Sequence, residues 1–262
     1  MRKLYGNTRF GQVHARLEES DGEATNAPLV CLHPAPSSGL YFETAMPMLN
    51  DGRKVIAPDY PGYGGSDALE EPPSITDYAN AMVDFLDSAG IEGPVDLLGF
   101  HTGCLVAAEM AHIDAGRVRR IVFCDVPYFT SEQQEAMRGK VTQPMPVGTE
   151  LDCLEGPWKF NVASRINDVS IHRALALFAE HIRTGSKDWY GFGAAFSYDC
   201  VSKFSSLDAD TVCLATQSGL HGPTEAAAKV IPGTSFVDVT EVTTAVFETG
   251  AEAIARHIKE AL

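Results

Sequence analysis

The residue whose type and position most directly suggest chemistry is a histidine inside a short stretch bracketed by two glycines, Gly99-Phe100-His101-Thr102-Gly103. An apolar run from 95 to 98 precedes this stretch, and an alanine-rich helix pattern follows it. The order predicts a buried strand, a sharp turn and a helix, because glycine lets a strand and a helix approach closely. We therefore expect the His101 side chain to project from the turn.

His101 would then lie at the amino end of the predicted helix. The dipole of a helix disfavours a positive charge at that end, so we expect the imidazole to be neutral near pH 7. A neutral imidazole takes a proton from water or from a carbon acid. The position thus favours general-base chemistry.

Three segments of the chain resemble the α/β-hydrolase superfamily. Leu32-His33-Pro34-Ala35-Pro36 is similar to the HG-x-P oxyanion turn of that family, and Asp59-Tyr60-Pro61-Gly62-Tyr63-Gly64-Gly65-Ser66-Asp67 is similar to its D-x-P-G-x-G-x-S-D loop. The stretch around His101 has the spacing of its nucleophile elbow, G-x-S-x-G. The resemblance implies an α/β-hydrolase fold, with a mostly parallel sheet flanked by helices and an inserted helical cap.

The resemblance also implies a serine nucleophile, a histidine and an acid, and this chain departs from all three. His101 replaces the serine, and Thr244 stands where the histidine after the last strand is expected. The loop 217–221, where the acid is expected, contains no carboxylate. An ordinary serine-esterase mechanism is therefore not expected.

The remaining site residues are assigned by the same resemblance. Asp125 ends a predicted strand where some members of the family place their acid, so His101 and Asp125 are the candidate catalytic residues. Backbone N–H groups of Ala35 and Thr102 match the oxyanion-hole donors, which stabilise developing negative charge. Other candidate oxyanion or substrate-binding residues are His33, Trp189 and Tyr190. His33 also has a purely structural interpretation, as does the pair Asp59 and Asp67.

Alternation of strand and helix patterns supports a parallel sheet with helices on both faces. It stops after residue 129 and resumes near 211, so we predict a core of 1–129 and 207–262 with a helical cap or lid at 130–206. Trp189 and Tyr190 are among the many aromatic residues of that cap. We expect strands at 4–10, 12–17, 29–32, 54–57, 95–98, 120–124, 211–216 and 235–239, and core helices at 41–49, 74–89, 223–230 and 246–262.

Composition narrows the class of protein further. The 262 residues carry a net charge of -15, which disfavours nucleic acid and anionic membrane surfaces as partners. No long apolar run is present, so we expect a cytoplasmic protein without a membrane segment. The six cysteines form no C-x-x-C pair and no metal-type spacing, and we expect neither a metal nor another cofactor. The sequence leaves open whether the chain forms a homodimer.

Three functional interpretations follow. In the first, His101 acts as general base on a small carbonyl compound, with ester or lactone hydrolysis as the default reaction. In the second, the protein is a lyase, an isomerase or a cofactor-free oxygenase, which needs only a base and an oxyanion hole to form an enolate. In the third, it is a non-catalytic pseudoenzyme that kept the pocket and binds a small molecule. The sequence does not name the substrate.

Overall fold

The computed structural model describes residues 1–20 and 22–262 of the chain. Eight strands form one sheet in the spatial order β1-β2-β4-β3-β5-β6-β7-β8. The neighbouring pairs from β4 to β8 are parallel, whereas β2 is antiparallel to both β1 and β4. The strands are β1 (Arg2–Thr8), β2 (Gly11–Glu18), β3 (Leu29–Leu32), β4 (Val55–Pro58), β5 (Val95–Phe100), β6 (Val118–Cys124), β7 (Asp210–Thr216) and β8 (Ser235–Val239).

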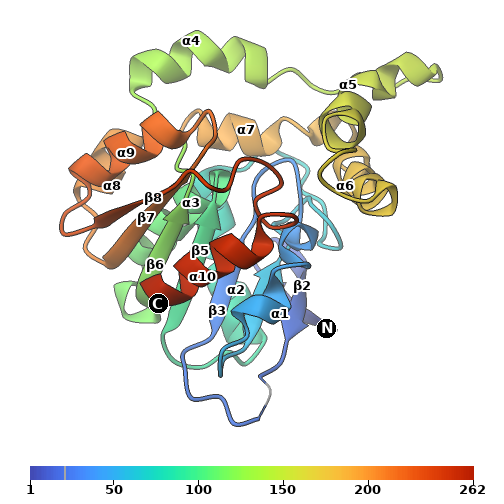
Figure 1. Cartoon of the computed structure of the whole chain (residues 1–262). Helices are drawn as coiled ribbons and strands as arrows, with labels where there is room; N and C mark the ends of the chain where they lie inside the picture. Colours follow the sequence, from blue (N-terminus) through green and yellow to red (C-terminus); the bar gives the residue numbers. More distant parts are fainter. Residues whose placement is uncertain (21) are drawn as a thin grey trace.

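Helices cover both faces of this sheet (Figure 1). One face packs against α2 (Ile75–Ser88), α3 (Thr102–Ile113) and α9 (His221–Val230), and the other packs against α1 (Met46–Leu49) and α10 (Ala251–Ala261). Every residue of β3, β4 and β5 is buried, which explains why these strands are continuous apolar runs in the sequence. The predicted mostly parallel sheet with helices on both faces is confirmed.

Local signals define α2 well. Ser74 accepts a hydrogen bond from the backbone of Asp77, whose carboxylate accepts one from the backbone of Ser74 in return. This reciprocal pair is a capping box, which satisfies two backbone donors at the start of the helix. Gly90 follows the last turn with a positive φ of 68°, a conformation that favours glycine.

Two predicted core helices differ from the structure. The segment 41–49 is divided into a 3₁₀ turn, η1 (Gly39–Phe42), and the short α1, whose start carries a proline. The closing helix begins at Ala251, not at 246, because a turn at Ala245, with a φ of 44°, interrupts the chain before it. Phe247 lies in this turn and is nevertheless fully buried, so its apolar character reflects packing and not helix periodicity.

Between β6 and β7 the chain forms the helical segment 130–206. Figure 1 shows its helices α4 to α7 above the sheet. The segment contacts the core closely at Gly191, whose N–H donates to the hydroxyl of Tyr63 at 2.9 Å. A Cβ atom at Gly191 would lie 2.3 Å from the Cβ of Ala35, so only glycine fits there. Its helices are α4 (Ser131–Val141), η3 (Leu151–Leu154), α5 (Glu155–Trp158), the π-helix η4 (Lys159–Ala163), α6 (Ile171–Arg183), η5 (Gly185–Lys187), α7 (Tyr190–Ala195) and α8 (Cys200–Ser205).

Within residues 1–20 and 22–262, no helix combines the length and the apolar character that crossing a membrane requires.

Candidate active site

The backbone at His101 is strained in the way the glycine-bracketed stretch predicts. His101 joins β5 to α3 with φ 50° and ψ -117°, a conformation that side chains rarely adopt. A Cβ atom at Gly99 would lie 2.6 Å from the carbonyl oxygen of Gly103. A Cβ atom at Gly103 would lie 1.9 Å from the carbonyl oxygen of Leu32. The two glycines therefore allow β3, β5 and α3 to pack together, and this packing holds the turn.

The imidazole of His101 is partly open to a pocket. Its side chain retains 39% of its accessible surface, and its ring centroid lies 4.1 Å from that of Phe100. Burial lowers the pKa of His101 to about 4; the charge of Asp125 opposes this shift and the charge of Arg165 adds to it. The ring is therefore neutral near pH 7, and the dipole of α3 acts in the same direction.

Asp125 lies at the carboxyl end of β6, beside His101. Its carboxylate is fully buried and accepts hydrogen bonds from the N–H of Thr216 at 2.9 Å and from its hydroxyl at 2.6 Å. The nearer oxygen is 4.0 Å from Nε2 of His101, which is too long for a hydrogen bond. Asp125 thus acts on His101 through its charge, while Thr216, at the end of β7, fixes the carboxylate.

The pocket beside His101 has a volume of about 60 Å³. That volume exceeds the space that a single water molecule needs. The helical segment 130–206 supplies part of its wall. The lining residues are Pro34, Ala35, Pro36, Ser37, Tyr41, Phe100, His101, Phe160, Asn161, Arg165 and Leu177.

The structure brings Ala35 and Thr102 close to His101. Ala35 lines the pocket, and Thr102 is the first residue of α3. Within 1–20 and 22–262, neither backbone N–H has a protein acceptor. Both N–H groups are therefore available to a ligand oxygen. Ser37 also lines the pocket, but in the same described ranges its hydroxyl makes no hydrogen bond to His101.

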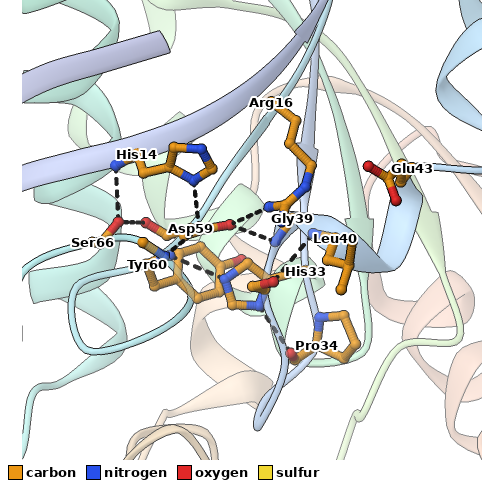
Figure 2. Close-up of polar contacts among 12 residues, drawn as sticks. His14, Arg16, His33, Pro34, Gly39, Leu40, Glu43, Asp59, Tyr60 and Ser66 are labelled. Carbon is orange, nitrogen blue, oxygen red and sulfur yellow. Dashed lines mark hydrogen bonds and ion pairs between the residues drawn. The ribbon is translucent and has the colours of Figure 1, made fainter. Parts of the chain in front are cut away.

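His33 is placed in the core and not in the pocket. Its side chain is fully buried, Nδ1 donates to the carbonyl of Pro34 at 2.9 Å, and Nε2 accepts from the N–H of Tyr60 at 3.0 Å (Figure 2). Burial lowers the pKa of His33 to about 4, which leaves the ring neutral and suited to these two bonds. His33 therefore joins the turn after β3, at Pro34, to the loop after β4, at Tyr60.

Asp59 organises the neighbouring loop, as Figure 2 shows. One carboxylate oxygen accepts from Arg16 at 3.2 Å and from the N–H of Gly39 at 2.8 Å. The other accepts from Nδ1 of His14 at 2.7 Å and from the N–H of Gly65 at 2.8 Å. Burial opposes ionisation of Asp59, but the bond from His14 and the charge of Arg16 outweigh it, so its pKa is lowered. Asp67 similarly accepts from the backbone of Gln12 at 2.7 Å.

Trp189 and Tyr190 do not line the pocket beside His101. The Tyr190 hydroxyl donates to the carbonyl of Glu70 at 3.0 Å, and its ring borders a second small cavity under Arg183 and Lys187. The Trp189 ring packs edge-on against Tyr190. Tyr190 therefore joins the helical segment to the loop after β4, and Trp189 packs against Tyr190 outside the lining of the pocket beside His101.

Sequence reasoning missed three residues that surround His101. Tyr41 stacks on Phe100 with ring centroids 5.5 Å apart, and Arg165 enters the pocket from the turn after η4. The sequence predicts Thr216 only as the last residue of the strand at 211–216. No local sequence signal identifies Arg165 or Thr216, because each acquires its role from a neighbour remote in the chain.

The structure also places the two positions where the resemblance implies the histidine and the acid of a triad. Thr244 is exposed in the loop after β8. At the start of α9, after β7, Nε2 of the half-buried His221 lies 3.4 Å from a carboxylate oxygen of Asp238, and His221 is outside the pocket lining. Throughout the described part of the chain, no three His, Cys, Asp or Glu side chains cluster in a way that would hold a metal ion.

Comparison with known proteins agrees with this geometry. A family model for the alpha/beta hydrolase fold matches residues 27–144. A cis-3-alkyl-4-alkyloxetan-2-one decarboxylase from Xanthomonas campestris pv. campestris is 30% identical over 141 residues, which are 50% of this chain and 46% of that protein. The matched part thus spans about half the length of this curated relative.

Solved structures match over nearly the whole chain. A thermophilic esterase from Thermogutta terrifontis has a TM-score of 0.76 at 18% identity, covering 99% of this chain and 97% of its own. The enol-lactonase from Burkholderia xenovorans LB400 has a TM-score of 0.78 at 13% identity, covering 98% of both chains. With the strand order and the family match over residues 27–144, these similarities show that the chain has the α/β-hydrolase fold.

Proposed function

We propose that this protein is an enzyme that acts on a small carbonyl compound, with His101 as its general base in place of a serine nucleophile. The observation that carries the proposal is the strained turn, which directs a neutral imidazole into a small pocket. Maintaining such strain costs roughly 1–3 kcal/mol, which favours a function for the side chain at that position. The helices of 130–206 serve as a cap that closes the pocket.

The default reaction is hydrolysis of an ester or a lactone. His101 takes a proton from water as the water oxygen bonds to the substrate carbonyl carbon. The N–H groups of Ala35 and Thr102 form the oxyanion hole for the carbonyl oxygen. The bond to the alcohol oxygen then breaks, and the imidazolium returns its proton to that oxygen. Asp125 stabilises the imidazolium by its charge.

The low pKa of His101 restricts the substrate. A base with a pKa near 4 is always available at neutral pH but gives proton transfer little driving force. The carbonyl must therefore be activated, as in a strained lactone or an ester with a good leaving group. The names of two similar proteins support lactones: one is an enol-lactonase, and the other is a decarboxylase of an oxetan-2-one.

The alternative reaction is non-hydrolytic. In this case His101 removes a proton from carbon, and the oxyanion hole holds the resulting enolate, as a lyase, an isomerase or a cofactor-free oxygenase requires. The lack of any hydrogen bond between Ser37 and His101 among the described residues favours this chemistry over acyl transfer to serine. A pseudoenzyme that only binds a small molecule is the remaining candidate.

The test compares wild type with His101→Ala and His101→Gln on p-nitrophenyl acetate and on β- and γ-lactones. Loss of a general base should reduce turnover by ~10²- to 10⁴-fold in both variants. His101→Ser should stay inactive, because Thr244 supplies no base for a new serine. Full activity in His101→Ala would remove His101 from the mechanism.

Two further readouts separate the alternatives. A fluorophosphonate probe should leave Ser37, Ser38 and Thr102 unlabelled, and stoichiometric labelling of any of them would restore a serine mechanism. Exchange of a substrate α-proton in D₂O without hydrolysis, dependent on His101, would favour the enolate reaction. Ligand binding that is equal in wild type and both variants, without turnover, would favour the pseudoenzyme.

A further inference from the structure

Arg165 differs from the other arginines of the cap in its electrostatic surroundings. Arg173 is paired with Glu43 at 2.8 Å and with Glu248 at 2.7 Å, and Arg138 is paired with Glu135 at 3.4 Å. Within residues 1–20 and 22–262, the arginines that lack a carboxylate within 4 Å are Arg165 and Arg183. Arg165 is the one of these two that lines the pocket beside His101.

Two aromatic rings lie beside the guanidinium of Arg165. Its central carbon lies 5.5 Å from the ring centroid of Tyr41 and 5.7 Å from that of Phe160. Both rings also line the pocket. Neither ring carries a negative charge, so the guanidinium, with its five N–H donors, keeps the capacity to bind an anion.

The backbone around Arg165 is equally well anchored. Its N–H donates to the carbonyl of Val162 at 3.1 Å, and its carbonyl accepts from the N–H groups of Asp168 at 2.9 Å and Val169 at 3.0 Å. Asp168, although three residues away, forms no ion pair with it. Among residues 1–20 and 22–262, no carboxylate therefore pairs with this half-buried cation, in a molecule whose net charge is -15.

We infer that the pocket beside His101 binds a carboxylate through Arg165, so that the substrate carries a carboxylate group in addition to its reacting carbonyl. The planar edge of a guanidinium matches a carboxylate with two parallel hydrogen bonds. Arg165 and His101 line the same pocket, so a carboxylate bound by the guanidinium would lie in the pocket that holds the imidazole. The carboxylate-binding site stands on the geometry alone; its place on the substrate rests on the proposed function.

The test measures binding of propionate and of its neutral analogue propionamide by isothermal titration at pH 7 in 0.15 M NaCl. Wild type should bind propionate at least ~10-fold more tightly than propionamide, because hydrogen bonds to a charged group contribute more than neutral ones. Arg165→Met should lose this preference while propionamide affinity stays the same. Arg165→Lys should retain part of the preference, since lysine keeps the charge but loses the two-bond geometry.

Arg183→Met is the matched control, because it removes the other unpaired arginine without changing this pocket. It should bind propionate as wild type does. A His101→Gln protein should also retain the preference, so loss of turnover in that variant leaves the carboxylate site standing. Circular dichroism of each variant establishes that it is folded.

Four outcomes would overturn the inference. One is equal affinity of wild type for propionate and propionamide, or no binding of either. Another is an unchanged preference in a folded Arg165→Met protein. The third is a parallel loss in Arg183→Met, which would assign the effect to overall charge. Displacement of propionate by an equal concentration of chloride would likewise reject a site specific for carboxylates.

Discussion

Two buried aspartates in this molecule each lie beside a histidine, and the two pairs are built differently. Asp59 accepts four hydrogen bonds, one of them from His14 at 2.7 Å, and the His14 side chain is 6% exposed. Asp125 accepts two bonds, both from Thr216, and lies 4.0 Å from a His101 side chain that is 39% exposed. The first pair is buried and joined by a hydrogen bond, whereas the second has no hydrogen bond between its members and leaves its histidine open to a pocket.

This contrast distinguishes a structural pair of histidine and aspartate from the candidate catalytic pair. The bond between His14 and Asp59 is complete and joins β2 to the loop after β4. Neither ring nitrogen of His101 has a hydrogen-bond partner among the described residues, and the ring meets solvent or ligand instead. Proximity of a histidine and an aspartate is therefore not evidence of catalysis. A histidine side chain that faces a pocket and has no protein hydrogen-bond partner is better evidence of a catalytic candidate.

The largest expected effect is on stability, at the pair of His14 and Asp59. Asp59→Asn replaces one carboxylate oxygen, which accepts two hydrogen bonds, by an NH₂ group. That group can only donate, and it would face the N–H donor of His14 or of Arg16. Removing one partner from a buried charged network costs ~3–5 kcal/mol, so the free energy of unfolding should fall by about that amount. Urea denaturation at pH 7 measures it. A loss below 1 kcal/mol would show that Asp59 is dispensable to the loop.

A smaller loss of stability and a clear loss of activity are expected at the open pair. Asp125→Asn can still accept from the N–H of Thr216 and donate to its hydroxyl, so we expect a stability loss of ~1–2 kcal/mol. The charge near His101 disappears. At this distance, with screening from the pocket, that charge is worth roughly 1–2 kcal/mol to the imidazolium, and kcat should fall by about 10-fold or more.

Thr216→Val provides the control for this variant. It removes the 2.6 Å hydroxyl bond but keeps both the carboxylate charge and the bond from the backbone N–H. Turnover should therefore fall less than in Asp125→Asn. If the two variants lose activity equally, the position of Asp125 matters and its charge does not. If neither loses activity, Asp125 has no part in the reaction.

The smallest effect concerns pH. Burial lowers the pKa of His101 in the folded protein to about 4, below the ordinary value of 6.5 that applies when the chain is unfolded. Between these values the unfolded chain binds more protons, so stability falls as pH decreases from about 6.5 through 4. The buried His33 contributes in the same direction.

Urea unfolding between pH 4.5 and 7 measures this slope. His101→Gln should show a shallower dependence than wild type and retain the part due to His33. Asp59 also affects stability, but only at lower pH. Its pKa is lower in the folded protein than in the unfolded chain, so the stability that it contributes is lost as pH falls below about 4. Identical slopes in wild type and His101→Gln would mean that folding leaves the pKa of His101 unchanged.

The sequence alone determined the elements whose signals are local. Buried parallel strands are apolar runs, and the strand at 29–32 and the strand at 235–239 have the observed bounds. The histidine turn is only partly local: Gly99 is required by contacts with Gly103 and Cys104 inside the turn, whereas Gly103 is required by the neighbouring strand β3 at Leu32. Covering helices were predicted less well where packing, and not periodicity, made residues apolar, as at Phe247.

Tertiary structure alone decided what surrounds His101. Arg165 reaches the pocket from the helical segment 130–206, Thr216 meets Asp125 across two adjacent strands, and Tyr41 stacks on Phe100, each pair being far apart in the chain. Trp189 and Tyr190 lie elsewhere, although their aromatic character is that of a pocket wall. Such roles depend on which elements meet in space, and neither residue type nor local spacing encodes that meeting.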